Sequence, residues 1–207
     1  MSVRILITAF EAYDHWTENS SWLTLVEFTK QMRNDATIVT RRYPVDFAAV
    51  RSRLAEDLAQ HYDFALHLGQ APGAPCIELE AIGLNVGGSL HEPADQYHPI
   101  VDGGPAAYLS DLPLGNWVRG LRSRGMPATL SYHAGTFLCN ATLYLTQYLA
   151  ETRGLPTKAT FVHLPLDVSQ VTSLNKGTPS YPASDSAKAI DFVVEAMIKH
   201  AQGQALV

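Results

Sequence analysis

Short apolar segments alternate along this chain with longer segments whose apolar residues recur at helical spacing, and this alternation most constrains the fold. Short runs rich in branched residues are typical of buried strands, whereas apolar positions three and four residues apart are typical of amphipathic helices. The predicted strands are Arg4–Phe10, Thr37–Val45, Phe64–Leu68, Ala128–His133 and Ala159–Leu166, with Cys76–Val86 as a further extended segment. The predicted helices span about 22–32, 50–58, 113–124, 137–152 and 190–197, with Ser20 or Ser21 capping the first and Ser184 or Ser186 the last.

Strands that alternate with helices pair mostly in parallel, because each helix carries the chain back across one face of the sheet. The chain has 207 residues, of which 46% are hydrophobic and 17% charged, and this is enough apolar material for one packed core. No repeat, low-complexity tract or linker divides it. The sequence therefore predicts an α/β fold: a single domain over residues 1–207 with a three-layer α/β/α architecture, in which helices cover both faces of a mixed, mostly parallel central sheet.

Charge and hydropathy argue against two classes of partner. The formal net charge is −5 and no basic run suits a phosphate backbone, so nucleic acid is not expected as a partner. No apolar run approaches the roughly 20 residues of a membrane-spanning helix, so no membrane association is expected. The first residues are typical of a strand rather than a signal peptide, and two cysteines are too few for a disulfide framework. These features indicate a cytoplasmic, reducing compartment.

Two irregular stretches, 87–104 and 168–183, are predicted as loops. Structureless loops of this length are usually functional or mobile. In open α/β sheets, binding sites form at the carboxyl ends of the strands. Three segments of the chain that meet this description also carry reactive side chains.

The first reactive segment is SYHAGTFLCNATLY, in which a strand ends, small residues turn the chain, and Cys139 arrives at the start of a helix. The partial positive charge and free N–H groups of a helix N-terminus stabilise a thiolate, which is the nucleophilic form of cysteine. The same N–H groups could hold the oxyanion of a tetrahedral intermediate. A lone cysteine is more often a small packing residue, and Cys139 taken by itself would be interpreted as one.

The other two segments carry the partners that a catalytic cysteine needs. His163 lies in FVHLPL, near the end of a strand, where a histidine is more often a core residue than a base. A cysteine protease needs an imidazole to take the thiol proton and then protonate the leaving amine. In CIELEAIGLNV, alternation puts Glu78 and Glu80 on one face of an extended segment. Either carboxylate could orient the imidazole as the acid of a triad does, and periodicity does not separate them.

No metal or cofactor motif competes with this set. The eight histidines include no H-E-x-x-H spacing, and neither a Walker-type phosphate loop nor a dinucleotide-binding glycine pattern occurs. We therefore expect no metal ligands and no organic cofactor.

The three segments together resemble the pyroglutamyl peptidase I family, also called pyrrolidone carboxyl peptidases, and the resemblance runs over about residues 5–170. ILITAFEAYDHWTENSSW is similar to the family's T-G-F-x-P-F and N-P-S pattern, HLGQAPG to its G-Q-A-G-G turn, and LEAIGLNV to its E-R-x-A-x-N segment. DGGPAAYLSDLPL matches a further block. SYHAGTFLCNATLY matches A-G-T-Y-x-C-N, the most specific block, and FVHLPLDVSQ matches F-I-H-V-P with a following Gln. All blocks occur in the family's order.

The resemblance implies a cysteine omega-peptidase that removes N-terminal pyroglutamate from peptides through an acyl-enzyme, without a cofactor. It implies Glu80, Cys139 and His163 as the catalytic triad. The residues that it implies for substrate binding are Phe10, Tyr13, Asn19, Gln70, Phe137 and Leu138. It also implies a homo-oligomer, either a dimer or a tetramer. The pyroglutamyl ring is small, flat and uncharged, which suits a pocket of aromatics and a few amide groups.

The chain departs from the family pattern at four positions. Ala9 replaces a Gly, Ala12 replaces a Pro, Ala81 stands where an Arg follows the catalytic Glu, and Leu90 replaces a second family Arg. The change at Leu90 keeps open a related cysteine amidase that acts on another small lactam or N-acyl group. The altered loop 87–104 keeps open a non-catalytic binding homologue, although a chain with no chemistry to perform has no need of all three triad residues.

Overall fold

The computed structural model describes residues 2–31, 33–89, 92–172, 174 and 177–204. Six strands form the main sheet in the order β2-β1-β3-β8-β4-β7. They are β1 (Val3–Phe10), β2 (Ala36–Tyr43), β3 (Phe64–Gln70), β4 (Ile77–Glu80), β7 (Ala128–Ser131) and β8 (Lys158–Leu164). Four of the five neighbouring pairs are parallel and β4 runs antiparallel to β8, so the prediction of a mixed, mostly parallel sheet is confirmed.

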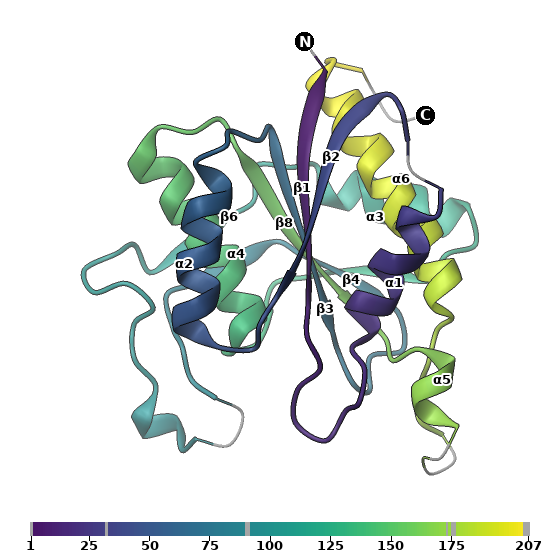
Figure 1. The fold of residues 1–207 in the computed structure, drawn as a ribbon, viewed down its shortest axis with the longest axis horizontal. Coiled ribbons are helices and arrows are strands. Elements are labelled where there is room, and N and C mark those ends of the chain that lie inside the picture. The colour runs from purple at the N-terminus through teal and green to yellow at the C-terminus, as the bar shows by residue number, and fades with distance from the viewer. Residues whose placement is uncertain (1, 32, 90–91, 173, 175–176, 205–207) are drawn as a thin grey trace.

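Helices cover both faces of this sheet (Figure 1). On one face lie α1 (Ser20–Thr29), α3 (Leu114–Ser123) and α6 (Ala183–Ala201), and on the other lie α2 (Phe47–Leu58) and α4 (Leu138–Arg153). Each face has its own buried core: Trp117 and Ile190 belong to the first, and Leu54, Tyr144 and Phe161 to the second. The three predicted layers are therefore present, because each amphipathic helix buries its apolar stripe against one side of the sheet.

The predicted caps differ from the observed ones. Helix α1 is capped by Asn19, whose side-chain oxygen accepts from the Ser21 N–H at 3.0 Å, so Ser20 and Ser21 lie inside the first turn. Helix α6 begins at Ala183, whose N–H donates to Oδ1 of Asp167 at 2.6 Å. This cap comes from 16 residues away, and therefore neither predicted serine is needed to begin the helix.

The extended segment 76–86 divides at Ala81. Strand β4 stays in the main sheet, whereas β5 (Ile82–Leu84) leaves it and pairs antiparallel with β6 (Ala107–Leu109), a short strand that the sequence did not predict. The backbone of Ala81 joins both, since its N–H donates to the carbonyl of Ser131 and its own carbonyl accepts from Ser110. Strand β5 then packs so closely on α4 that a Cβ on Gly83 would lie 2.7 Å from a backbone nitrogen.

The two predicted loops contain local structure. Residues 87–104 hold a short 3-10 helix at Ala94–Gln96, and the Gly88 N–H donates to the carbonyl of Thr136, just before Cys139. The stretch 168–183 begins with a short helix, α5 (Val168–Val171), so the prediction of a plain loop was wrong there. The sequence D-V-S-Q closes a capping box at its start.

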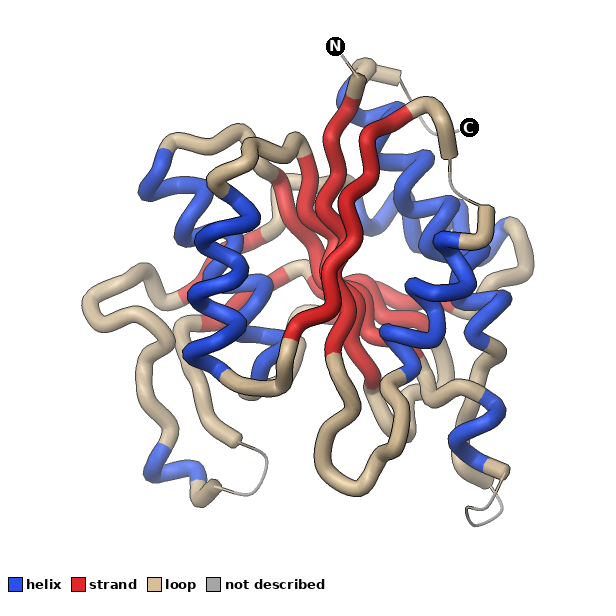
Figure 2. The backbone as a smooth tube through the Cα atoms, viewed as in Figure 1, coloured by secondary structure: helices blue, strands red, loops and turns tan. Residues whose placement is uncertain are grey.

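The carboxyl ends of β1, β3 and β8 lie together because these three strands are parallel neighbours. Figure 2 shows the long loop after β1 at this end of the sheet. Among the described residues, no helix is both long and apolar enough to cross a membrane.

Candidate active site

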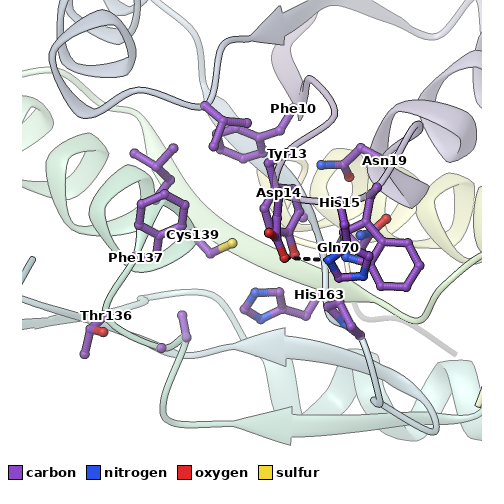
Figure 3. Close-up of a pocket in the computed structure, with 17 residues that line it drawn as sticks. Phe10, Tyr13, Asp14, His15, Asn19, Gln70, Thr136, Phe137, Cys139 and His163 are labelled. Carbon is purple, nitrogen blue, oxygen red and sulfur yellow. Dashed lines mark hydrogen bonds and ion pairs between the residues drawn. The ribbon is translucent and has the colours of Figure 1, made fainter. Parts of the chain in front are cut away.

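A cavity of about 440 Å³ opens at the carboxyl ends of β1, β3 and β8. Its walls come from the loop after β1, the turn after β3, the turn before α4 and the end of β8 (Figure 3). Eight of the nine side chains predicted to form the site line it: Phe10, Tyr13, Asn19, Gln70, Phe137, Leu138, Cys139 and His163. The ninth, Glu80, lies fully buried and contacts His163. Segments distant in the sequence therefore meet at one place.

Cys139 is the second residue of α4, which begins at Leu138. The thiol lies close enough to the His163 imidazole to affect the pKa of the ring, and Figure 3 shows the sulfur and the ring near each other at the cavity. Gly69 of β3 lies behind the sulfur: a Cβ there would come within 3.0 Å of Sγ and 2.4 Å of the Phe161 ring. Any larger residue at position 69 would displace the thiol or the ring.

His163 is held from the other side by Glu80. Nδ1 of the imidazole lies 2.7 Å from Oε1 of the carboxylate. The antiparallel register of β4 and β8 pairs Glu78 with His163 and Glu80 with Phe161, which puts all three polar side chains on one face. In the described part of the chain, Glu80 is the glutamate with a hydrogen bond to His163, although the register sets Glu78 directly opposite the histidine. The side-chain hydrogen bond therefore separates two residues that periodicity left equivalent.

The charges around His163 favour its protonated form. Burial by itself lowers the pKa of the imidazole, but the negative charge and hydrogen bond of Cys139, followed by those of Glu80, outweigh burial and raise it to about 10. An imidazolium between a thiol and a carboxylate stabilises the thiolate, the reactive form of Cys139. Burial and the charge of Glu80 also raise the pKa of the neighbouring Glu78.

Glu78, Glu80 and His163 form the one group of described residues whose donor atoms lie close enough to hold a metal ion, within 4.8 Å of one another. Sequence spacing did not suggest this group, because it forms only when β4 and β8 pair. Nδ1 of His163 already faces Oε1 of Glu80 at hydrogen-bond distance. The geometry is therefore that of a histidine oriented by a carboxylate.

Aromatic rings form much of the cavity wall. Phe10 packs against Phe161, with ring centroids 6.3 Å apart, and Phe137 meets Phe47 edge-on at 5.4 Å. Tyr13 adds a hydroxyl to this wall. Burial and the charge of Cys139 raise the pKa of Tyr13 to about 12, and its contact with the Gln70 amide offsets part of that rise. An apolar, largely aromatic wall suits a flat uncharged ring.

Two amide side chains border the same cavity in different ways. Asn19 uses its amide within the protein: Nδ2 donates to the carbonyl of Glu11, and Oδ1 accepts from the backbone and hydroxyl of Ser21. Its bonds hold the first loop in place. Gln70 is nearly buried, and its Oε1 accepts from the Ser20 N–H at 2.8 Å and from Nε2 of Gln170 at 2.7 Å.

Two further residues of the site carried no predicted role. Asn140 follows the cysteine and makes three hydrogen bonds to β5 and the residues just after it: its Oδ1 accepts from the Leu84 N–H, and its Nδ2 donates to the carbonyls of Leu84 and Val86. These bonds fix the start of α4 against β5. Gln170 holds Gln70, as described above. The capping-box pattern D-V-S-Q was a readable signal for Gln170, whereas nothing local marks the partners of Asn140.

The departures from the family pattern fall at different places. Ala81 is buried in the core beneath α3 and α6 and brings no charge to the site. Ala9 is buried in β1, directly before Phe10. Leu90 lies outside the described residues.

Comparisons with known proteins agree with this geometry. The sequence pattern of the C15 peptidase family, described as "Pyroglutamyl peptidase", matches residues 3–200. A protein of Clavibacter michiganensis named pyrrolidone-carboxylate peptidase is 36% identical over 205 residues, covering 95% of this chain and 93% of that protein.

Solved structures agree as well. The pyrrolidone carboxyl peptidase of Fervidobacterium islandicum AW-1 superposes with a TM-score of 0.89 at 29% identity, covering 97% of this chain and 99% of that one. The enzyme of Thermococcus litoralis gives the same TM-score and identity, covering 97% and 96%. Because the family pattern matches nearly the whole length of the chain, this chain belongs to the pyroglutamyl peptidase family, peptidase family C15.

Proposed function

We propose that this protein is a cysteine peptidase that releases N-terminal pyroglutamate from peptides, with Cys139, His163 and Glu80 as its catalytic residues. The observation that carries the proposal is the contact chain from thiol to imidazole to buried carboxylate at the wall of an apolar cavity. Membership of the C15 family supports the same substrate class.

The chemistry proceeds in two halves. The Cys139 thiolate attacks the carbonyl carbon that joins pyroglutamate to the next residue, and N–H groups at the start of α4 hold the oxyanion. His163 gives its proton to the leaving amine as the C–N bond breaks, which leaves a thioester on Cys139. Water then attacks the thioester while His163 takes one of its protons, and pyroglutamate leaves as the thiolate re-forms. Glu80 keeps the imidazole oriented and stabilises its cationic form.

The cavity suits the shape and polarity of the pyroglutamyl group that is transferred to Cys139. Phe10, Tyr13, Phe137 and Leu138 supply apolar surface for the ring, and Gln70 supplies an amide for its polar edge. Asn19 holds the first loop beside them. The ring of pyroglutamate carries neither a free amine nor a carboxylate, so the pocket needs no buried countercharge.

We extend the proposal to the setting in which the enzyme works. Residues 1–207 form one catalytic domain, which assembles as a homo-dimer or homo-tetramer. The cytoplasm suits this chemistry, because a reducing compartment keeps the nucleophilic thiol free. Both cysteines, Cys76 and Cys139, are free thiols here.

A related cysteine amidase that acts on a different small lactam or N-acyl group is the second candidate. The replacement of a family Arg by Leu90, which lies outside the described residues, motivates this alternative. Turnover of pyroglutamyl, prolyl, glutamyl and acetyl amides separates the two candidates. High selectivity for the pyroglutamyl amide would reject the amidase.

The direct test is release of p-nitroaniline from pyroglutamyl p-nitroanilide, with and without a thiol-blocking reagent. We expect Cys139→Ala to abolish turnover and Cys76→Ala, the matched control at the other free thiol, to retain it. Full activity in Cys139→Ala would contradict the proposal.

A further inference from the structure

We infer that Gln170 is a positioning residue that turns the Gln70 amide so that its NH₂ group, and not its oxygen, faces the cavity and receives the ring carbonyl of pyroglutamate. The inference rests on the proposed function and assigns the origin of its lactam selectivity. Gln170 lies in α5, 100 residues after Gln70, and makes this contact from outside the cavity wall.

The orientation of the Gln170 amide follows from two backbone groups. Its Oε1 accepts from the N–H of Asp167 at 2.8 Å, and its Nε2 donates to the carbonyl of Glu18 at 3.0 Å. A backbone N–H can only donate and a backbone carbonyl can only accept. The two ends of the Gln170 side chain are therefore assigned by chemistry, and its NH₂ group is the end that faces Gln70.

The orientation of Gln70 follows in turn. The NH₂ group of Gln170 and the backbone N–H of Ser20 are both donors, at 2.7 and 2.8 Å, so the atom between them must be the oxygen Oε1 of Gln70. The Gln70 side chain is nearly buried, and its Nε2 makes no hydrogen bond of ordinary geometry among the described residues. The Gln70 amide interacts with the Tyr13 hydroxyl, and both residues line the cavity.

A buried donor that lacks an acceptor favours a ligand that brings one. Pyroglutamate brings a ring carbonyl, whereas proline has the same five-membered ring without that oxygen. A prolyl substrate would leave Nε2 of Gln70 unpaired, and sites built around a specific hydrogen bond reject analogues that lack it by large factors. The amide orientation set by Gln170 thus distinguishes the two rings.

Two substitutions at Gln170 separate positioning from a merely structural role. Gln170→Glu keeps an oxygen for the Asp167 N–H but presents a carboxylate oxygen to Oε1 of Gln70, which repels it and favours the flipped amide. Gln170→Met removes every hydrogen bond of the side chain but repels nothing, so Oε1 of Gln70 keeps only the Ser20 N–H and the amide is held less firmly.

The measurement is KM and kcat for pyroglutamyl p-nitroanilide in wild type and both variants. We expect Gln170→Glu to raise KM about tenfold or more with a smaller change in kcat, and Gln170→Met to raise KM by about threefold, because one of the two donors to Oε1 of Gln70 is lost. An unchanged KM in Gln170→Met would mean that Gln170 does not position Gln70 and would overturn the inference. The opposite order, with Met more harmful than Glu, would mean that Gln170 serves only the capping box of α5 and would overturn the inference.

A second variant keeps the inference testable if Gln170→Glu does not fold. Gln70→Glu retains an oxygen for both donors and replaces only the NH₂ group that faces the cavity, so we expect a similar rise in KM. An unchanged KM in Gln70→Glu would overturn the inference while leaving the proposed function intact. No turnover by the wild type would overturn the proposed function and the inference together.

Discussion

Nδ1 of His163 lies 2.7 Å from Oε1 of Glu80, and the carboxylate is fully buried while the imidazole borders the cavity. A buried carboxylate is costly unless it has a partner, and here the partner is a ring that carries a positive charge. Together with Cys139, Glu80 therefore helps to set the charge state of the imidazole.

Replacing Glu80 tests this coupling. The carboxylate favours the imidazolium, so Glu80→Gln lowers the pKa of His163 from its raised value, and protonated His163 is lost at lower pH than in the wild type. We expect the alkaline limb of kcat/KM for a pyroglutamyl amide to move to lower pH, with kcat/KM about 100-fold lower near neutral pH.

The matched control for Glu80→Gln is Glu78→Gln. Glu78 lies on the same strand face and close to His163, and Glu80 makes the hydrogen bond to the imidazole. Its replacement should move the alkaline limb much less. Equal shifts in the two variants would mean that general negative charge, and not the bond from Glu80, sets the pKa of His163.

The two free thiols should differ in reactivity. Cys139 faces an imidazolium in the cavity, whereas burial and the charge of Glu78 raise the pKa of Cys76, with Arg122 offsetting part of the rise. We expect iodoacetamide near pH 7 to alkylate Cys139 at least about tenfold faster than Cys76, as followed by peptide mass spectrometry. The rates should become equal in denaturant, and equal rates in the folded protein would argue against an activated Cys139.

Asn140 should contribute strongly to stability because its side chain makes three hydrogen bonds to Leu84 of β5 and to Val86 just after it. Asn140→Ala removes all three, and at about 1 kcal/mol each the free energy of unfolding should fall by about 2–4 kcal/mol. Urea unfolding measures the change. Asn116→Ala on the exposed side of α3 is the control, with an expected loss below about 0.5 kcal/mol, and equal losses would contradict the role of Asn140.

His67 should make the protein less stable in acid. The Thr146 hydroxyl donates to the carbonyl of Thr142, so Nε2 of His67 donates to Thr146, and Nδ1 accepts from Thr8. Burial lowers the pKa of this neutral imidazole to about 3. The unfolded chain takes up a proton below about pH 6.5 while the folded one does not, so stability is fully present above that pH and falls towards pH 3.

The size of this acid effect follows from the two pKa values. Between about pH 7 and pH 5, His67 should cost about 2 kcal/mol of unfolding free energy. Urea unfolding at both pH values, in the wild type and in His67→Gln, isolates the contribution of His67. Between these pH values the unfolding free energy of the variant should fall by about 2 kcal/mol less than that of the wild type. An equal loss in both proteins would show that His67 is not the group responsible.

Much of the fold was readable locally. Periodicity of two or 3.6 residues reports which side of a segment is buried, and it predicted all six strands of the main sheet and the five long helices from neighbouring residues alone. The small residues before Cys139 predicted a turn into a helix, and α4 indeed begins at Leu138, one residue before the cysteine. For the same reason the sequence missed β6, whose three residues carry too short a pattern to detect.

Contacts between distant segments were decided by the tertiary structure. Glu78 and Glu80 lie on the same face of β4, and the pairing of β4 with β8 brings both near His163. The hydrogen bond to the imidazole, across 83 residues, is made by Glu80. Two further hydrogen bonds likewise join residues that no local pattern connects: the Asp167 carboxylate accepts from the first N–H of α6, and the Gln170 amide donates to Gln70. The sequence by itself determined the elements and the residue types that carry the chemistry. Their pairing and the direction of each amide depend on which buried donors and acceptors meet when the sheet closes, and that is a property of the whole fold.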